Sequence, residues 1–101
     1  MSDRNAALFL VVTIKPRPDR LAEAEAQLQS MRRNSVAEPG CVFMHLAQPH
    51  GDPHTWMMLE MFRSRAAWDE HMRQPYVSEG NQILGDLLLE PSDLRLLDEM
   101  P

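Results

Sequence analysis

Cysteine and lysine are almost absent from this sequence. The one cysteine, Cys41, has no partner for a disulfide within the chain, which fits a reducing compartment. Lys15 is the only lysine among ten basic residues, and the formal net charge is −5. A protein that binds nucleic acid needs clustered positive charge to neutralise phosphates. We therefore expect a cytoplasmic protein that does not bind nucleic acid.

Long apolar runs and glycine-rich loops are missing as well. The apolar run over residues 6–14 is too short to cross a bilayer, and residues 1–5 lack the basic start of a signal peptide. The four glycines are isolated from one another, so the sequence contains none of the loops that cradle the phosphates of NAD, FAD or ATP. We expect no membrane association and no bound cofactor.

The composition is that of an ordinary globular protein. Hydrophobic residues make up 44% and charged residues 25% of the 101 residues, which suits one domain over residues 1–101. The β-branched run over residues 6–15, closed by Pro16, predicts a strand buried on both faces. Two more strands, residues 41–48 and 55–62, flank a turn-rich connector and predict a hairpin, and residues 93–98 predict a short last strand.

Helices are expected between these strands. The first begins at Pro18 and ends near Ala37, because Pro39 disfavours helical geometry at the residue before it. Ser64 is a good N-cap for a second helix that runs to about Gln74, and residues 76–89 predict a third. The order β-α-β-β-α-(α)-β is the split βαβ, ferredoxin-like pattern of the α+β class, with a four-stranded antiparallel sheet and helices on one face. Since the first strand is apolar on both sides, we expect a homodimer in which two sheets pack across their open faces.

Alternation along the hairpin assigns side chains to faces. One face of the second strand carries Val42, Met44 and Leu46, and the other carries Cys41, Phe43 and His45. The third strand carries Trp56, Met58, Glu60 and Phe62 on one face, where Glu60 is the only charged member.

Glu60 and His71 form the pair that looks most like chemistry. His71 has the side chain best suited to act as a general base near neutral pH. Burial of Glu60 would raise the pKa of its carboxyl, or Glu60 would hold His71 in one tautomer if the two are paired. The structural alternatives are a helix histidine bonded to the sheet or to Glu60, and a glutamate bonded to backbone or to an arginine at the dimer interface.

The remaining candidates are weaker. Phe43, Trp56, Met58 and Trp68 are expected to line a substrate pocket, although methionine and aromatic residues at strand spacing are more often plain core. His45, His50 and His54 surround one hairpin without a metal-binding spacing, so we expect no metal site.

Several of these residues together resemble the antibiotic biosynthesis monooxygenase (ABM) domain family. The resemblance is carried by Glu38-Pro39-Gly40-Cys41, the hairpin, Glu60, Ala66-Ala67, His71 and Pro75, and it extends from about Leu8 to Leu97. It implies a homodimeric α/β-barrel with a pocket between sheet and helices and with no metal or flavin. The namesake members are similar to oxygenases in which a polycyclic phenol itself supplies electrons to O2, whereas others are isomerases or haem-degrading enzymes.

Three positions depart from the pattern of that family. Val36 follows Ser35 where an arginine is common, Met44 stands where a tyrosine is usual, and Phe62 stands where a tryptophan is common.

The resulting expectation is a cofactor-independent monooxygenase-like enzyme for a small aromatic, quinol or enol substrate, in which a base deprotonates the substrate and O2 reacts in a dry pocket. The alternatives are an isomerase that uses the same base and a non-catalytic ligand-binding or structural dimer. A haem-degrading role is a further option, but the first strand lacks the asparagine which that subgroup uses.

Overall fold

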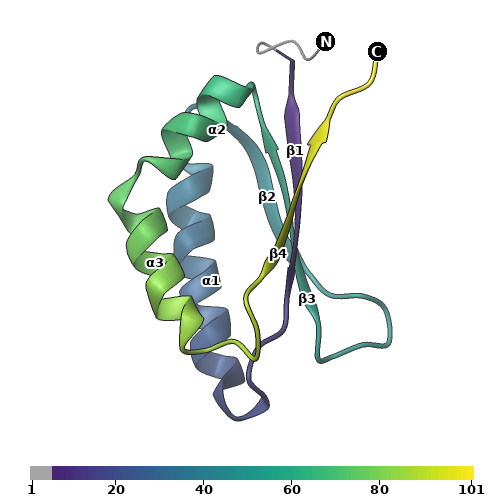
Figure 1. The fold of residues 1–101 in the computed structure, drawn as a ribbon, viewed down its shortest axis with the longest axis vertical. Coiled ribbons are helices and arrows are strands. Elements are labelled where there is room, and N and C mark those ends of the chain that lie inside the picture. Colours follow the sequence, from purple (N-terminus) through teal and green to yellow (C-terminus); the bar gives the residue numbers. More distant parts are fainter. Residues whose placement is uncertain (1–5) are drawn as a thin grey trace.

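The computed structural model describes residues 6–101, so the chain start, where we expect no signal peptide, lies outside the described residues. Two layers build the fold, a sheet and a set of helices (Figure 1). Along the chain the elements are β1 (Leu8–Ile14), the 3₁₀ turn η1 (Pro18–Arg20), α1 (Leu21–Val36), β2 (Cys41–Ala47), β3 (Trp56–Phe62), α2 (Arg65–Met72), α3 (Pro75–Gly85) and β4 (Asp93–Asp98).

The sheet has the strand order β2-β3-β1-β4, and every neighbouring pair is antiparallel. All three α-helices lie on one side of it (Figure 1). This is the ferredoxin-like α+β fold that the order of sequence patterns predicted, and the prediction is confirmed. Among the described residues, no helix is long and apolar enough to span a membrane.

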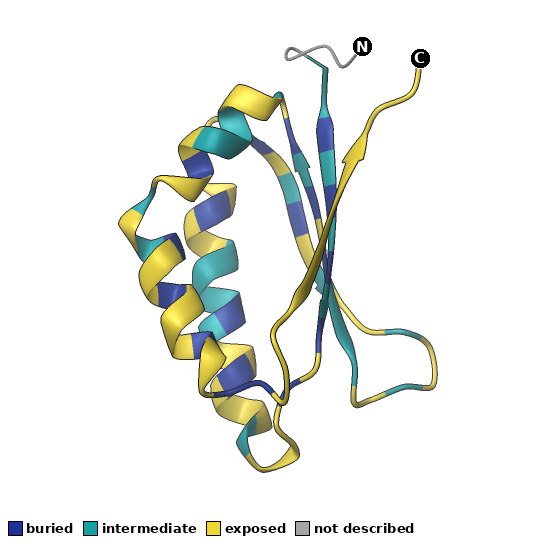
Figure 2. Ribbon diagram, viewed as in Figure 1, coloured by how far each residue is buried: buried dark blue, intermediate teal, exposed yellow. Residues whose placement is uncertain are grey.

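Burial along β1 alternates between buried and half-buried residues (Figure 2). Leu8, Leu10, Val12 and Ile14 are buried beneath the helices, whereas the residues between them are only half-buried on the open face. The expectation of a strand buried on both faces is therefore wrong for the single chain. The reason is that one helical layer covers only one face of a sheet.

A β-bulge changes the faces of β2. The register with β3 shifts between Cys41 and Phe43, so Cys41 pairs with Phe62 and Phe43 pairs with Met61. Cys41 and Met44 are both buried beneath the helices, while Val42 is exposed. The predicted grouping of Cys41 with Phe43 is wrong, because the bulge inserts one residue that strict alternation does not count.

Local signals fix most of the helix ends. The Ser64 side chain accepts a hydrogen bond from the Ala67 backbone N–H at 3.1 Å, which caps α2. Pro75 opens α3, where its fixed φ suits the first turn. α3 ends at Gly85, before the predicted residue 89, because residues 87–89 pair with residues 15–17, directly after β1. The Arg17 N–H donates to the Leu87 carbonyl and the Leu89 N–H donates to the Lys15 carbonyl, each at 2.9 Å.

Candidate functional site

A cavity of about 510 Å³ lies between the helical layer and the sheet. Its apolar wall comes from every layer of the fold and includes Leu10, Val12, Leu28, Met44, Leu84 and Leu88. Few polar side chains reach it, among them Ser35, Glu60, His71 and Asn81, with Arg17 and Glu90 also in the lining. An apolar pocket with a small number of converging polar groups is the usual form of a small-molecule site.

The turn before β2 is packed tightly against α2. A Cβ atom added at Gly40 would lie 2.5 Å from the Ala67 Cβ, so only glycine allows this approach. Arg63 holds the turn from β3, because its backbone N–H donates to the Gly40 carbonyl at 2.8 Å and its Nε donates to the Pro39 carbonyl at 2.9 Å. Ala67 lies one helical turn before His71, so this packing brings Glu38 to the histidine.

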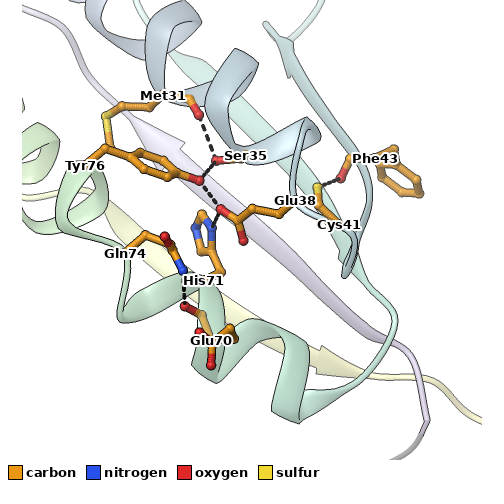
Figure 3. A network of polar contacts seen from close by, with 9 residues as sticks. All are labelled: Met31, Ser35, Glu38, Cys41, Phe43, Glu70, His71, Gln74 and Tyr76. Atoms are coloured by element: carbon orange, nitrogen blue, oxygen red, sulfur yellow. Dashed lines mark hydrogen bonds and ion pairs between the residues drawn. The ribbon is translucent and has the colours of Figure 1, made fainter.

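Glu38 is the hydrogen-bond partner of His71. The Glu38 Oε2 and His71 Nδ1 atoms are 2.8 Å apart, and the two side chains are only 17% and 8% exposed. Tyr76 donates its hydroxyl to the same carboxylate oxygen, and its Oη also lies 3.3 Å from the Ser35 Oγ (Figure 3). An ionised carboxylate only accepts hydrogen bonds, so His71 donates through Nδ1 and its Nε2 is left to accept a proton.

Glu60, which the sequence offered as a partner for His71, does not bond to it. Its side chain is 8% exposed, it lines the cavity, and it has no hydrogen-bond or ion-pair partner among residues 6–101. Burial raises the pKa of its carboxyl to about 7. Glu60 and His71 therefore line one cavity, but the group that fixes the histidine is Glu38.

Two of the four predicted wall residues lie at the cavity. Met58 and Trp68 line it, together with Met44. Phe43 lies on the open face of the sheet, paired with Met61 and stacked on His45 with 5.2 Å between ring centroids, so it is not part of the wall. Trp56 packs against the core from the first position of β3 and is not in the cavity lining either. Both placements correct the predicted wall.

Sequence reasoning missed Glu38, Tyr76 and Ser35 as members of the site. Glu38 was in view as part of the Glu-Pro-Gly turn, and its charge directly before a buried strand was a usable signal. Tyr76 follows Pro75 with no pattern that links it to Glu38. Burial and the Glu38 carboxylate raise the pKa of Tyr76, so its hydroxyl stays protonated and keeps donating.

Cys41 lies close to both carboxylates but is no nucleophile. Burial, and then the charges of Glu38 and Glu60, raise the pKa of its thiol to about 11, so it stays a neutral thiol. Within residues 6–101, no three His, Cys, Asp or Glu side chains come together as a group that could hold a metal ion.

Comparison with known proteins gives a consistent result. The sequence model of the antibiotic biosynthesis monooxygenase family matches residues 7–82. The chain is 31% identical over 83 residues to sll1783 of Synechocystis, an uncharacterised protein; the match covers 82% of this chain and 56% of that protein, so the chain spans little more than half of its length. It is also 31% identical over 88 residues to Rv0793 of Mycobacterium tuberculosis, a proposed monooxygenase, with 87% of this chain and 86% of that protein covered.

Solved structures share the fold. The structure of Rv0793 superimposes with a TM-score of 0.88 at 28% identity, covering 95% of this chain and 97% of that one. A proposed antibiotic biosynthesis monooxygenase from Caulobacter crescentus superimposes with a TM-score of 0.89 at 22% identity, covering 97% and 93%, which bears on the fold alone. With a family match over most of its length and relatives at 31% identity, this chain belongs to the antibiotic biosynthesis monooxygenase family.

Proposed function

We propose that this chain is a cofactor-independent monooxygenase that acts on a small phenol, quinol or enol in the cavity. One observation carries the proposal: His71 lines an apolar cavity while its Nδ1 is held by the nearly buried Glu38 carboxylate. That arrangement orients an imidazole and leaves one nitrogen to take a proton. The name of Rv0793, a proposed monooxygenase, supports the same reaction class.

The proposed reaction begins with proton transfer. The substrate loses the proton of a hydroxyl or of an acidic C–H to Nε2 of His71, and the Glu38 carboxylate stabilises the imidazolium that forms. Glu60, when protonated, donates a hydrogen bond to a substrate oxygen, because it has no other partner among the described residues. A positioned base of this kind contributes roughly 10²- to 10⁴-fold to a rate.

The oxygen step needs no electrons from outside. The electron-rich anion reacts with O2 at carbon; one oxygen atom stays on the substrate and the other leaves as water. The substrate supplies all four electrons, as when a CH2 group becomes a carbonyl or a quinol becomes a hydroxyquinone. The apolar wall excludes bulk water from this step.

Oxygen uptake tests the proposal. Purified protein is given a panel of quinols and anthrones in an oxygen electrode cell, and product is identified by mass. We expect turnover that falls at least roughly 100-fold in His71→Ala and is unchanged in His54→Ala, an exposed histidine of the β2–β3 connector. Turnover of an enol substrate without oxygen uptake would instead identify an isomerase, and binding without turnover would leave only a ligand-binding role.

The proposal includes a homodimer. The sheet face opposite the helices carries half-buried or exposed apolar side chains from three strands: Phe9, Val11, Phe43, Met57, Leu59 and Met61. A continuous apolar face of this kind is typical of an interaction surface, and two-fold pairing of equal faces is the commonest way to cover one. The proposal also places the protein in the cytoplasm, since a lone cysteine fits a reducing compartment.

A further inference from the structure

Glu60 and His71 lie toward one end of the cavity, whereas Arg17, Glu90 and Ser92 line it toward the other end. Glu60 is level with Leu10 in the β3–β1 register, and Leu88 bridges to Pro16 beyond the other end of β1. The five residues from Leu10 to Ile14 alone span about 13 Å at the rise of a strand. α3, which lines the cavity from Val77 to Gly85, follows the same direction (Figure 1).

The two ends differ in chemistry. Trp68 and His71 reach the polar end from α2, and Trp68 is the one Phe, Tyr or Trp among the described lining residues. The rest of the wall, toward Leu84 and Leu88, consists mainly of Leu, Val, Ile and Met side chains. Aliphatic and methionine side chains adapt to a flexible chain, whereas a flat polycycle gains most from stacked aromatic rings.

Charge sets a second limit on the ligand. Glu60 lines the polar end and Glu38 lies behind His71, and among the described residues no Lys or Arg side chain lines this end. The nearest lining cation along the cavity is Arg17, at the far end, where its Nε donates to the Asp86 carbonyl at 3.1 Å. An anionic group beside Glu60 would be desolvated without a positive partner.

We propose that the ligand of this cavity is an uncharged phenol or quinol that carries a flexible alkyl chain. The ring lies between Trp68 and His71 with its hydroxyl at Glu60, and the chain follows α3 toward Leu84 and Leu88. The position proposed for the ligand's ring rests on the base role proposed for His71. The position proposed for its alkyl chain rests only on the aliphatic side chains of the cavity wall.

A homologous series of phenols tests the ligand class. Binding of para-ethyl, para-butyl, para-hexyl and para-octyl phenol to the full chain is measured by calorimetry and by tryptophan fluorescence. Each buried methylene is expected to strengthen binding roughly fourfold until the chain emerges at the far end. The para-alkyl benzoates of equal length are expected to bind at least about tenfold more weakly at neutral pH. Affinity that does not depend on chain length, or benzoates that bind as well as phenols, would overturn the inference.

Variants on α3 test where the alkyl chain of the ligand lies. Leu84→Trp fills the cavity from a side chain that is 7% exposed, and its matched control is Ile83→Trp on the same helix, at a position that is 51% exposed and outside the lining. We expect Leu84→Trp to weaken the binding of para-octyl phenol at least about tenfold and to change the binding of para-ethyl phenol little. The control should change the affinity for neither phenol. If Leu84→Trp does not fold, Leu94→Trp, at an exposed position in the cavity lining, replaces it. Equal losses for long and short phenols would contradict the inference.

Failure of the ligand class and failure of the proposed function give different results. Binding that strengthens with chain length, without any oxygen uptake, supports this ligand class and refutes the monooxygenase. Oxygen uptake on an unsubstituted quinol, with no gain from an alkyl chain, supports the monooxygenase and refutes this ligand class.

Discussion

Glu38→Gln removes one charge from the site and almost no volume. Glu38 is not among the residues that line the cavity, so the substitution leaves the substrate's own contacts in place. The side-chain carbonyl of the introduced glutamine can still accept from Tyr76 or from His71, and the fold should be retained. What the variant loses is the negative charge 2.8 Å from the His71 Nδ1, which stabilises the imidazolium formed during proton transfer.

The expected loss follows from the strength of that contact. A hydrogen bond to a charged group contributes about 1.5–3 kcal/mol, and this one is nearly buried, so about 2 kcal/mol of transition-state stabilisation should disappear. That corresponds to a roughly 30-fold fall in kcat, with KM changed little because the binding contacts are intact. Steady-state oxygen uptake on a quinol measures both constants, and nitrogen NMR of the His71 ring reports which ring nitrogen carries the proton.

Glu70→Gln is the matched control for this variant. Glu70 is also a glutamate, carried on α2, but its side chain is exposed and pairs with Arg73 on the surface at 2.7 Å. The control should keep full activity and the wild-type tautomer of His71. The reasoning is refuted if Glu38→Gln retains the wild-type kcat, or if both variants lose activity equally.

Three further substitutions test other parts of the structure. The carboxyl of Glu60 has a pKa of about 7 in the folded state, against 4.5 for a free carboxyl. The part of the free energy of unfolding that depends on its protonation is therefore fully present below pH 4.5 and is lost as pH rises through 7. Glu60→Gln should remove up to roughly 3 kcal/mol of this pH dependence, measured by urea unfolding at pH 5 and pH 8; a wild-type stability that is flat over this range would contradict the pKa. Gly40→Ala should lower the free energy of unfolding by roughly 2 kcal/mol, because the added Cβ meets Ala67. Gly85→Ala has open space around the added Cβ and should be neutral or stabilising in the same assay. Equal effects of the two substitutions would refute the tight packing at Gly40. Val11→Asp, on the open sheet face, should convert a dimer to monomers or prevent folding, as seen by light scattering; a stable wild-type monomer at micromolar concentration would remove the homodimer from the proposal.

Most of the fold could be predicted because local signals determine it. Pro16, Pro39 and Ser64 mark element ends through backbone geometry or a single capping bond, and such effects act within a few residues. The strand order then follows from the few topologies that a βαββαβ pattern allows. The end of α3 was less predictable, because a backbone contact with Lys15, far away in sequence, decides it.

The candidate site was only partly within reach of the sequence. Glu60 and His71 stood out by residue type on an apolar background, and both line the cavity. The partner of His71 was not predictable in this way, since Glu38 is 33 residues away and reaches it only through the packing of Gly40 on Ala67. The predicted grouping of Cys41 with Phe43 failed because a bulge separates the two in β2, and periodicity alone contains no sign of an extra residue.

The contact among Glu38, His71 and Tyr76 ties together the end of α1, α2 and α3, while the cavity wall draws side chains from every strand as well. His71 belongs to both the contact and the cavity wall, whereas its partners Glu38 and Tyr76 lie outside the lining. Changes in the wall can alter which molecule fits without touching the acid–base groups, whereas a change at Glu38 affects reactivity and the seating of two helices at once. Because much of the wall is also the hydrophobic core, a change that reshapes the cavity also carries a cost in stability.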